Sequence, residues 1–412
     1  MQGLKKNASQ FYLLVLVNAF VGTMIGLERS VLPGLGKEVF FLNEYTVILS
    51  FILAFGITKA LANLAVAKLM LQKTRKQVLI AGWIAAIPVP FLLMYASSWW
   101  WIIAANIFLG INQGLAWSST VIMKIDLVGN KNRGLAMGIN EFAGYIAVGL
   151  AALLASNIAA DYGYRYFPFL PGVFFLLAGL LISIFLIKDT GHFVSHEAQT
   201  SANKIFNRLW TEVSWKHHNM GTVSINGLVN NMNDAMVWGV LPLLLIQRGF
   251  STVEIGWIAA VYPAVWGFMQ LFTGKLGDHA CKKQLITLGM IVQGLAILLM
   301  IISYSFIWML IAAVLLGIGT AFVYPNFLTV MAENLHPSQR AVGLSLFRFW
   351  RDSGYVMGAI LAGFLADSIG INGTLIFIAV LTIAAGILAQ VRMCCTLKFL
   401  WRSNQCSDMA MY

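Results

Sequence analysis

Twelve apolar segments divide this chain, and each is long enough to cross a lipid bilayer as a single helix. The hydrocarbon core of a bilayer is spanned by about 20 apolar residues in helical form. A mean hydropathy of +0.79 and a charged fraction of only 10% also exclude an ordinary soluble protein. We therefore expect an all-α membrane protein, embedded in the lipid bilayer, with spans at residues 10–33, 46–70, 78–97, 99–123, 135–158, 167–187, 220–246, 254–276, 285–304, 306–331, 342–366 and 373–393.

Basic residues are distributed unevenly between the two sides of these spans. If the N-terminus is cytoplasmic, twenty of the 27 Lys and Arg residues fall on the cytoplasmic side, three fall on the other side, and four lie within spans. Because an excess of Lys and Arg marks cytoplasmic loops, both termini are predicted to be cytoplasmic. The same pattern explains the net charge of +11 without a nucleic-acid partner. The four cysteines fall on this side too, where thiols stay reduced, so no disulfide is expected.

The second half of the sequence repeats the first. A constant shift of 207 residues superposes Gly82 on Gly289, Trp101 on Trp308 and Arg133 on Arg340, among other identities. Duplications of this kind are typical of transporters built from two related units. We expect two pseudo-symmetric six-helix bundles at residues 1–187 and 219–393, a cytoplasmic linker with an amphipathic helix at 188–218, and a cytoplasmic tail at 394–412.

Three charged residues lie inside the apolar span 342–366. Arg348, Arg351 and Asp352 are spaced i, i+3 and i+4, so they share one face of a helix. A charge at the centre of a bilayer costs on the order of 3 kcal/mol, so this face is expected to line a polar passage. Two pairings are open for Asp352. It either forms an ion pair with Lys59 of the second span, which should reach the same depth, or neutralises Arg348 on its own helix.

Carboxyl groups within the spans are the candidates for carrying protons. Asp234 lies in the middle of its span, and a buried carboxyl group can exchange a proton during transport. We rank Asp234 first and Glu141 second, with Asp352 as a further candidate; each could instead belong to a structural ion pair. Glu141 aligns with Arg348 under the shift of 207 residues, which favours an amphoteric or anionic substrate, or a gating bridge.

The neighbouring residues Glu28 and Arg29 lie near the outer end of the first span. They are expected to form a solvated or locally paired outer gate.

A loop in the second half has the spacing of a known motif. Residues Gly274-Lys-Leu-Gly-Asp278-His-Ala-Cys-Lys282-Lys283 are similar to the motif G-x-L-x-D-R-x-G-R-K of the major facilitator superfamily, which the chain resembles over essentially its whole length. The stretches 230–234 and 349–352 are similar to a bacterial branch of predicted efflux permeases. In that family the first, fourth, seventh and tenth spans line a central cavity. The resemblance therefore implies that substrate contacts come from polar and aromatic residues of these spans, namely Asn112, Gln113, Trp117, Asn226, Asn230, Trp238 and Tyr324.

The leading functional hypothesis is a secondary active transporter that moves a small solute across the bacterial cytoplasmic (inner) membrane by alternating access. The resemblance favours a monomer that uses the proton gradient, without a cofactor, and exports its substrate. The alternatives are an importer such as a proton symporter, a facilitator of the same fold, or a membrane sensor without transport. No nucleophile elbow, metal-ligand spacing or phosphate-binding loop occurs in the sequence, so neither an enzyme nor a metal site is expected.

Overall fold

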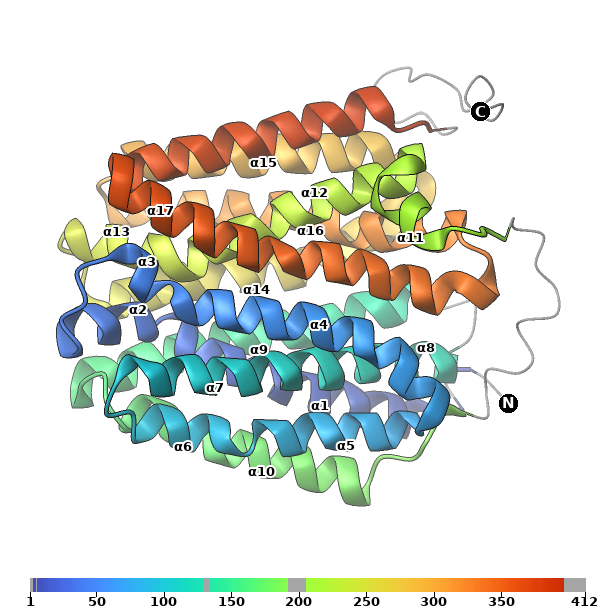
Figure 1. Cartoon of the computed structure of the whole chain (residues 1–412), viewed down its shortest axis with the longest axis horizontal. Coiled ribbons are helices and arrows are strands. Elements are labelled where there is room, and N and C mark those ends of the chain that lie inside the picture. Colours follow the sequence, from blue (N-terminus) through green and yellow to red (C-terminus); the bar gives the residue numbers. More distant parts are fainter. Residues whose placement is uncertain (1–2, 5, 129–132, 192–204, 396–412) are drawn as a thin grey trace.

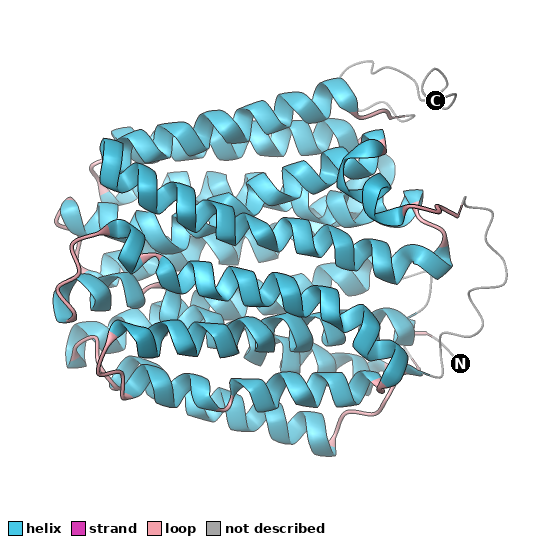
Figure 2. Cartoon of the chain, viewed as in Figure 1, coloured by secondary structure: helices cyan, strands magenta, loops and turns pink. Residues whose placement is uncertain are grey.

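The computed structural model describes residues 3–4, 6–128, 133–191 and 205–395, and every regular element in these ranges is a helix (Figure 2). The longer helices lie side by side along one direction (Figure 1). In chain order the elements are α1 (Ala8–Arg29), α2 (Leu32–Gly34), η1 (Leu35–Val39), α3 (Tyr45–Ile48), α4 (Ser50–Gln72), α5 (Arg75–Ala86), α6 (Pro88–Met94), α7 (Trp99–Asn112), η2 (Gln113–Trp117), α8 (Ser118–Val128), α9 (Arg133–Tyr162), η4 (Phe167–Phe169), α10 (Leu170–Phe185), α11 (Leu209–Thr211), η6 (Glu212–Lys216), α12 (His218–Ala235), η7 (Met236–Val240), α13 (Leu241–Gln247), α14 (Thr252–His279), α15 (Lys282–Ile302), α16 (Phe306–Asn334) and α17 (Pro337–Arg392).

Nine helical segments of the described chain are long and apolar enough to cross a membrane. The last of them, in α17, covers both of the final expected spans, and the helix is broken at Gly370, whose φ of 77° lies in the left-handed region that glycine adopts readily. The expected spans 99–123 and 220–246 coincide with helices that five-residue π-helical segments interrupt, η2 and η7. The chain is thus an all-helical, multi-pass membrane protein.

Helix packing repeats between the two halves of the sequence. A side chain at Gly110 would collide with α4 at Phe55, Thr58 and Lys59, and a side chain at Gly317 would collide with α14 at Tyr262, Val265 and Trp266. Each residue of the second contact lies 207 positions after its counterpart in the first. The shift detected in the sequence is therefore also a repeat of three-dimensional contacts.

Helices from the two halves pack against each other along two lines. In one, α4 lies beside α17; in the other, α9 lies beside α14 (Figure 1). At the end of the molecule that holds α3, the carboxylate of Asp367 on α17 accepts hydrogen bonds from the backbone amides of Tyr45 and Thr46, at 2.9 and 3.1 Å, and from the Thr46 hydroxyl. These bonds join the two halves at that end.

The segment between the halves and the end of α17 differ from expectation in two ways. Residues 192–204 of the linker, which include the first part of the expected amphipathic helix, lie outside the described residues, and the described part of the linker ends in the helical turns α11 and η6. Trp210 of α11 packs against Phe349 and Trp350 of α17, with ring centroids 5.7 and 6.0 Å apart. A disulfide joins Cys281 to Cys395, because the chain after α17 returns to the start of α15, so the expectation that all cysteines are reduced was wrong.

Candidate functional site

A small cavity lies between the two halves of the chain, with a volume of about 30 Å³, room for about one or two water molecules. This is far below the roughly 300–1,000 Å³ of small-molecule sites, so in this structure the two halves leave too little room for a solute. The lining side chains come from α1, α4, η2, α8 and α9 of the first half and from η7, α16 and α17 of the second. They are Ile25, Lys59, Asn63, Gln113, Trp117, Ser118, Tyr145, Val148, Trp238, Tyr324, Arg348, Arg351, Asp352 and Tyr355.

Local irregularities in two helices help to form this cavity. Gln113 and Trp117 lie at the two ends of the π segment η2, and Trp238 is in the middle of η7. A π-helical turn inserts one extra residue into a helix and redirects the side chains that follow, which is why such turns are frequent at functional sites. These two segments bring the expected cavity residues Gln113, Trp117 and Trp238 to its wall.

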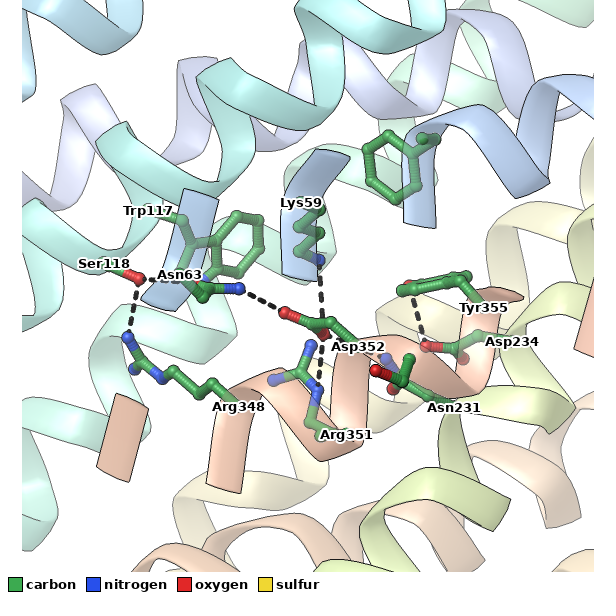
Figure 3. Close-up of polar contacts among 12 residues, drawn as sticks. Lys59, Asn63, Trp117, Ser118, Asn231, Asp234, Arg348, Arg351, Asp352 and Tyr355 are labelled. Carbon is green, nitrogen blue, oxygen red and sulfur yellow. Dashed lines mark hydrogen bonds and ion pairs between the residues drawn. The ribbon is translucent and has the colours of Figure 1, made fainter. Parts of the chain in front are cut away.

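The carboxylate of Asp352 is the centre of a polar network across the cavity (Figure 3). Its Oδ1 lies 3.0 Å from Nε of Arg351 and 3.9 Å from Nζ of Lys59, and it accepts a 3.0 Å hydrogen bond from Asn231. Its Oδ2 accepts a 2.5 Å hydrogen bond from Asn63. The ion pair expected between Lys59 and Asp352 is therefore present and joins α4 to α17, whereas the alternative pairing with Arg348 is not formed.

Arg348 is linked to the same network through neutral groups (Figure 3). Its Nη1 donates a 2.8 Å hydrogen bond to the Ser118 hydroxyl, and that hydroxyl donates a 2.8 Å hydrogen bond to Oδ1 of Asn63. Asn63 in turn binds Asp352 through its amide nitrogen. Residues of both halves thus form one continuous chain of polar contacts from Arg348 to Asp352.

Two further carboxylates lie behind the cavity wall. Asp234 is fully buried and accepts hydrogen bonds from the hydroxyls of Tyr262, at 2.5 Å, and Tyr355, at 3.0 Å. Glu141 accepts hydrogen bonds from Nε1 of Trp117 and Nδ2 of Asn140, at 3.1 and 2.8 Å. Neither carboxylate lines the cavity, but each contacts a residue that does, Tyr355 or Trp117. Glu141 makes no ion pair with Arg348, so the gating bridge suggested by their alignment is not formed here.

Glu28 and Arg29 are fully buried and pair with each other, so of the two expected arrangements the locally paired one is present and the solvated one is not. Nε of Arg29 lies 3.8 Å from Oε1 of Glu28, and the amide of Asn106 donates a 3.0 Å hydrogen bond to Oε2. The Arg29 guanidinium lies over the Phe55 ring, 4.4 Å from its centroid, which compensates part of the cost of burying the charge. The pair is therefore an internal contact between α1, α4 and α7.

Three of the expected substrate contacts do not reach the cavity. Asn112 donates a hydrogen bond to the backbone oxygen of Gly82 and so ties α7 to α5, and Asn226 donates to Thr222 of its own helix. Asn230 is buried away from the wall. An α-helix presents only one face to a cavity, so polar residues on a cavity helix also serve contacts between helices.

The loop motif of the second half contributes an ion pair rather than a cavity wall. Lys282 Nζ lies 3.0 Å from Oε1 of Glu333, which joins the start of α15 to α16. Gly274 lies in α14, where an added side chain would meet open space. Lys283 is buried, and the side chain of Asp278 lies outside the described residues.

Sequence reasoning missed several residues of the site. Asn63 follows Lys59 by one helical turn, and Tyr355 follows Asp352 by three residues, so both were detectable as same-face neighbours of charges. Ser118 and Tyr262 gave no comparable signal, because a hydroxyl in an apolar span is common and usually bonds its own helix. Their roles depend on how distant helices pack.

Residues 14–217 and 223–402 match the Major Facilitator Superfamily. The chain is 23% identical over 259 residues to an uncharacterized MFS-type transporter of Methanocaldococcus jannaschii, covering 63% of this chain and 66% of that protein, just under two thirds of its length. It is 25% identical over 342 residues to Multidrug resistance protein MdtG of Proteus mirabilis, covering 79% and 81% of the two chains.

Among solved structures, a POT family transporter in complex with a thioalcohol-conjugated peptide superposes with a TM-score of 0.73 at 13% identity, covering 92% of this chain and 94% of that one. At this identity the likeness shows a shared fold only. The family match extends over nearly the whole chain, and the relative from Methanocaldococcus jannaschii is itself named an MFS-type transporter. The chain therefore belongs to the Major Facilitator Superfamily.

Proposed function

We propose that the protein is a secondary active transporter that exports a small solute by alternating access, driven by the proton gradient and without a cofactor. In this proposal twelve spans form two six-helix bundles, at residues 1–187 and 219–393, with the linker 188–218, the tail 394–412 and both termini on the cytoplasmic side of the inner membrane. The central observation in its support is the cavity between the halves, where Lys59 and Asp352 pair across the boundary.

A contact that joins the halves at a cavity is the kind of contact that alternating access must break and remake. The two halves can expose the cavity to one side or the other only if their mutual contacts have more than one arrangement. The ion pair of Lys59 with Asp352 and the chain from Arg348 through Ser118 to Asn63 are such contacts. The proposal takes a monomer as the working unit.

Asp234 is the first candidate for coupling to protons. Its side chain is fully buried. It accepts hydrogen bonds from two tyrosine hydroxyls, one on α14 and one on α17. Protonation would remove one of its acceptor sites and weaken the hold of Tyr355, a cavity residue, on α12. The effect of proton binding at Asp234 would thereby be transmitted to the cavity wall through the side chain of Tyr355. Glu141 and Asp352 are the second and third candidates.

Export is favoured over import by the relatives, since MdtG is named for multidrug resistance. The experiment uses proteoliposomes with an imposed pH gradient and a panel of labelled drugs, organic acids and sugars. We expect gradient-driven transport by the wild type, while Asp234→Asn abolishes the dependence on the gradient yet retains exchange of substrate between the two sides. Asp161→Asn, the same change at an exposed position, is the matched control and should behave as the wild type.

The outcomes separate the alternatives. A gradient response in Asp234→Asn equal to that of the wild type would exclude Asp234 from coupling. Transport without any gradient response indicates a facilitator, and accumulation in the opposite direction indicates a symporter. A panel without any transported solute would favour a sensor.

A further inference from the structure

We propose that the substrates of this cavity are aromatic organic anions, with the anionic group bound at Arg348 and Ser118 and the ring bound against Trp117 and Tyr145. The inference rests on the proposed function, because it takes the cavity to be the transport site. It adds the chemical class of the solute and the residues that select it.

The charges of the cavity wall do not cancel. Its four charged side chains are three cations, Lys59, Arg348 and Arg351, and one carboxylate, Asp352, so their sum is +2. The carboxylate is already engaged by Arg351 and Lys59 and by two asparagine amides. The wall therefore carries an excess of positive charge in a site partly shielded from water, where an anion is attracted more strongly than in bulk solvent.

Arg348 is the cation without a carboxylate. No Asp or Glu of the described residues lies within ion-pair distance of its guanidinium, and its hydrogen bond goes to the neutral hydroxyl of Ser118. A guanidinium has five N–H donors, which suit the paired oxygens of a carboxylate, sulfonate or phosphonate. Arg348 is only half-buried and lines the cavity, so its guanidinium faces the space between the two halves.

The two carboxylates behind the wall do not supply this missing partner. Glu141 accepts from Trp117 and Asn140, and Asp234 accepts from Tyr262 and Tyr355. Both are separated from the cavity by the residues to which they are bonded. Trp117 and Tyr355 therefore lie between these carboxylates and the cavity, and neither carboxylate makes a direct contact with Arg348.

Aromatic side chains lie directly beside the anion site. Trp117 precedes Ser118 in the chain and lies beside it (Figure 3), and its ring centroid lies 5.3 Å from that of Tyr145. Aromatic rings of a ligand pack favourably against such faces. Because the hydrogen-bonding serine and the tryptophan are consecutive residues, the anionic group and the ring of the solute should be joined directly or by a short linker.

The test compares three ligands that share one ring system and differ in charge: naphthalene-2-sulfonate, naphthalene-2-sulfonamide and 2-naphthyltrimethylammonium. Their binding to the full-length protein in lipid nanodiscs is measured by isothermal titration calorimetry. We expect the sulfonate to bind at least about tenfold more tightly than the neutral and cationic compounds, as one charge-assisted contact supplies. A sulfonate that binds no more tightly than the other two overturns the proposal.

Substitutions then locate the site. Arg348→Gln should weaken sulfonate binding about tenfold or more and leave sulfonamide binding unchanged, while Arg348→Lys should restore part of the loss because it keeps the charge. Arg208→Gln, the same change at an exposed arginine outside the cavity, is the control and should have no effect. Equal sulfonate affinity in Arg348→Gln and Arg208→Gln would overturn the assignment of Arg348.

The proposal and the proposed function fail in different ways. Charge-selective binding that depends on Arg348, combined with no transport in proteoliposomes, would reject the transporter and leave the anion site. Transport of neutral or cationic solutes with no preference for the sulfonate would reject the anion site and leave the transporter.

Discussion

Asp352 is the residue on which the polar contacts of the cavity converge. Arg351 and Lys59 pair with its carboxylate, and Asn63 and Asn231 donate hydrogen bonds to it, so three helices are joined by one side chain. A buried ion pair contributes little net stability relative to apolar residues, but removing one partner leaves an uncompensated charge and is costly. Substitution of Asp352 and substitution of Lys59 should therefore lower the stability of the protein by different amounts.

Asp352→Asn should lower stability far more than Lys59→Gln. The first change leaves both Arg351 and Lys59 without their carboxylate, at a cost of about 3–5 kcal/mol. The second removes one contact at 3.9 Å and leaves the other three in place, at a cost on the order of 1 kcal/mol. The midpoint of thermal unfolding in detergent measures both, with Asp161→Asn as the control. Equal losses in the two variants would show that Asp352 is not the shared acceptor.

At the residue scale, the sequence predicted which charged side chains lie near one another, but it did not predict all of their ion-pair and hydrogen-bond partners. The spacing of Arg348, Arg351 and Asp352 and the expected depth of Lys59 placed all four in one region, and the structure has all four in the cavity wall. Whether Asp352 binds Lys59 or Arg348 depends on the distance between α4 and α17, which no local pattern encodes. For the same reason Asn112, a polar residue on a cavity helix, proved to bond the backbone of α5, whereas Asn226 bonds the backbone of its own helix.

At the scale of elements, small residues bring helices of the two halves into close contact. A side chain at Gly149 of α9 would come within 2.6 Å of the backbone oxygen of Ala260 in α14, and Gly56 of α4 packs in the same way against Tyr355 of α17. Helix association within a bilayer depends on such close packing, because lipid chains are as apolar as the side chains they replace. The interface between α9 and α14 should therefore not tolerate added volume at Gly149.

Gly149→Ala should destabilise the protein by about 1–3 kcal/mol, the usual cost of overpacking, because the backbone of α14 has to move away. Gly138→Ala is the matched control. It lies on the same helix and faces the same partner, but its added Cβ would sit 3.6 Å from the Gln270 backbone oxygen, an ordinary contact. Thermal unfolding of both variants in detergent measures the difference. A Gly149→Ala variant as stable as Gly138→Ala would mean that the contact between α9 and α14 is loose.

The helices themselves were largely predictable from apolar length, whereas their irregularities were not. The π segments η2 and η7 contain no proline and no charge, and nothing in their composition distinguishes them from regular helix. They arise where packing makes room for an extra residue in the turn. The break at Gly370 was expected only as a boundary between two spans.

At the scale of the whole molecule, the repeat in the sequence accounts for the pairing of helices within each half. The contacts of Gly110 with α4 recur at Gly317 with α14, shifted by 207 residues. The repeat relates contacts within the first half to contacts within the second. It gives no information on contacts between the halves, so it does not specify how one half faces the other. The hydrogen bonds of Asp367 to Tyr45 and Thr46 belong to this class, and neither the charge pattern nor the motifs indicated them.

If the halves rock about the cavity, the two ends of the molecule must open in turn. Opening the α3 end breaks the bonds of Asp367, and opening the opposite end separates α4 from α17 and α9 from α14 at that end. Spin labels report both movements as distances. Suitable positions are exposed and lie in different halves: Glu44 with Ser368 at the α3 end, and Lys68 with Lys275 at the other. The four native cysteines are first replaced by serine.

The most direct test of alternating access is a double electron–electron resonance measurement of these two label pairs in lipid nanodiscs, at acid and at alkaline pH. Alternating access predicts two distance populations for each pair, with the distance between positions 44 and 368 increasing when that between positions 68 and 275 decreases. A single, unchanged distance for both pairs under both conditions would contradict the account.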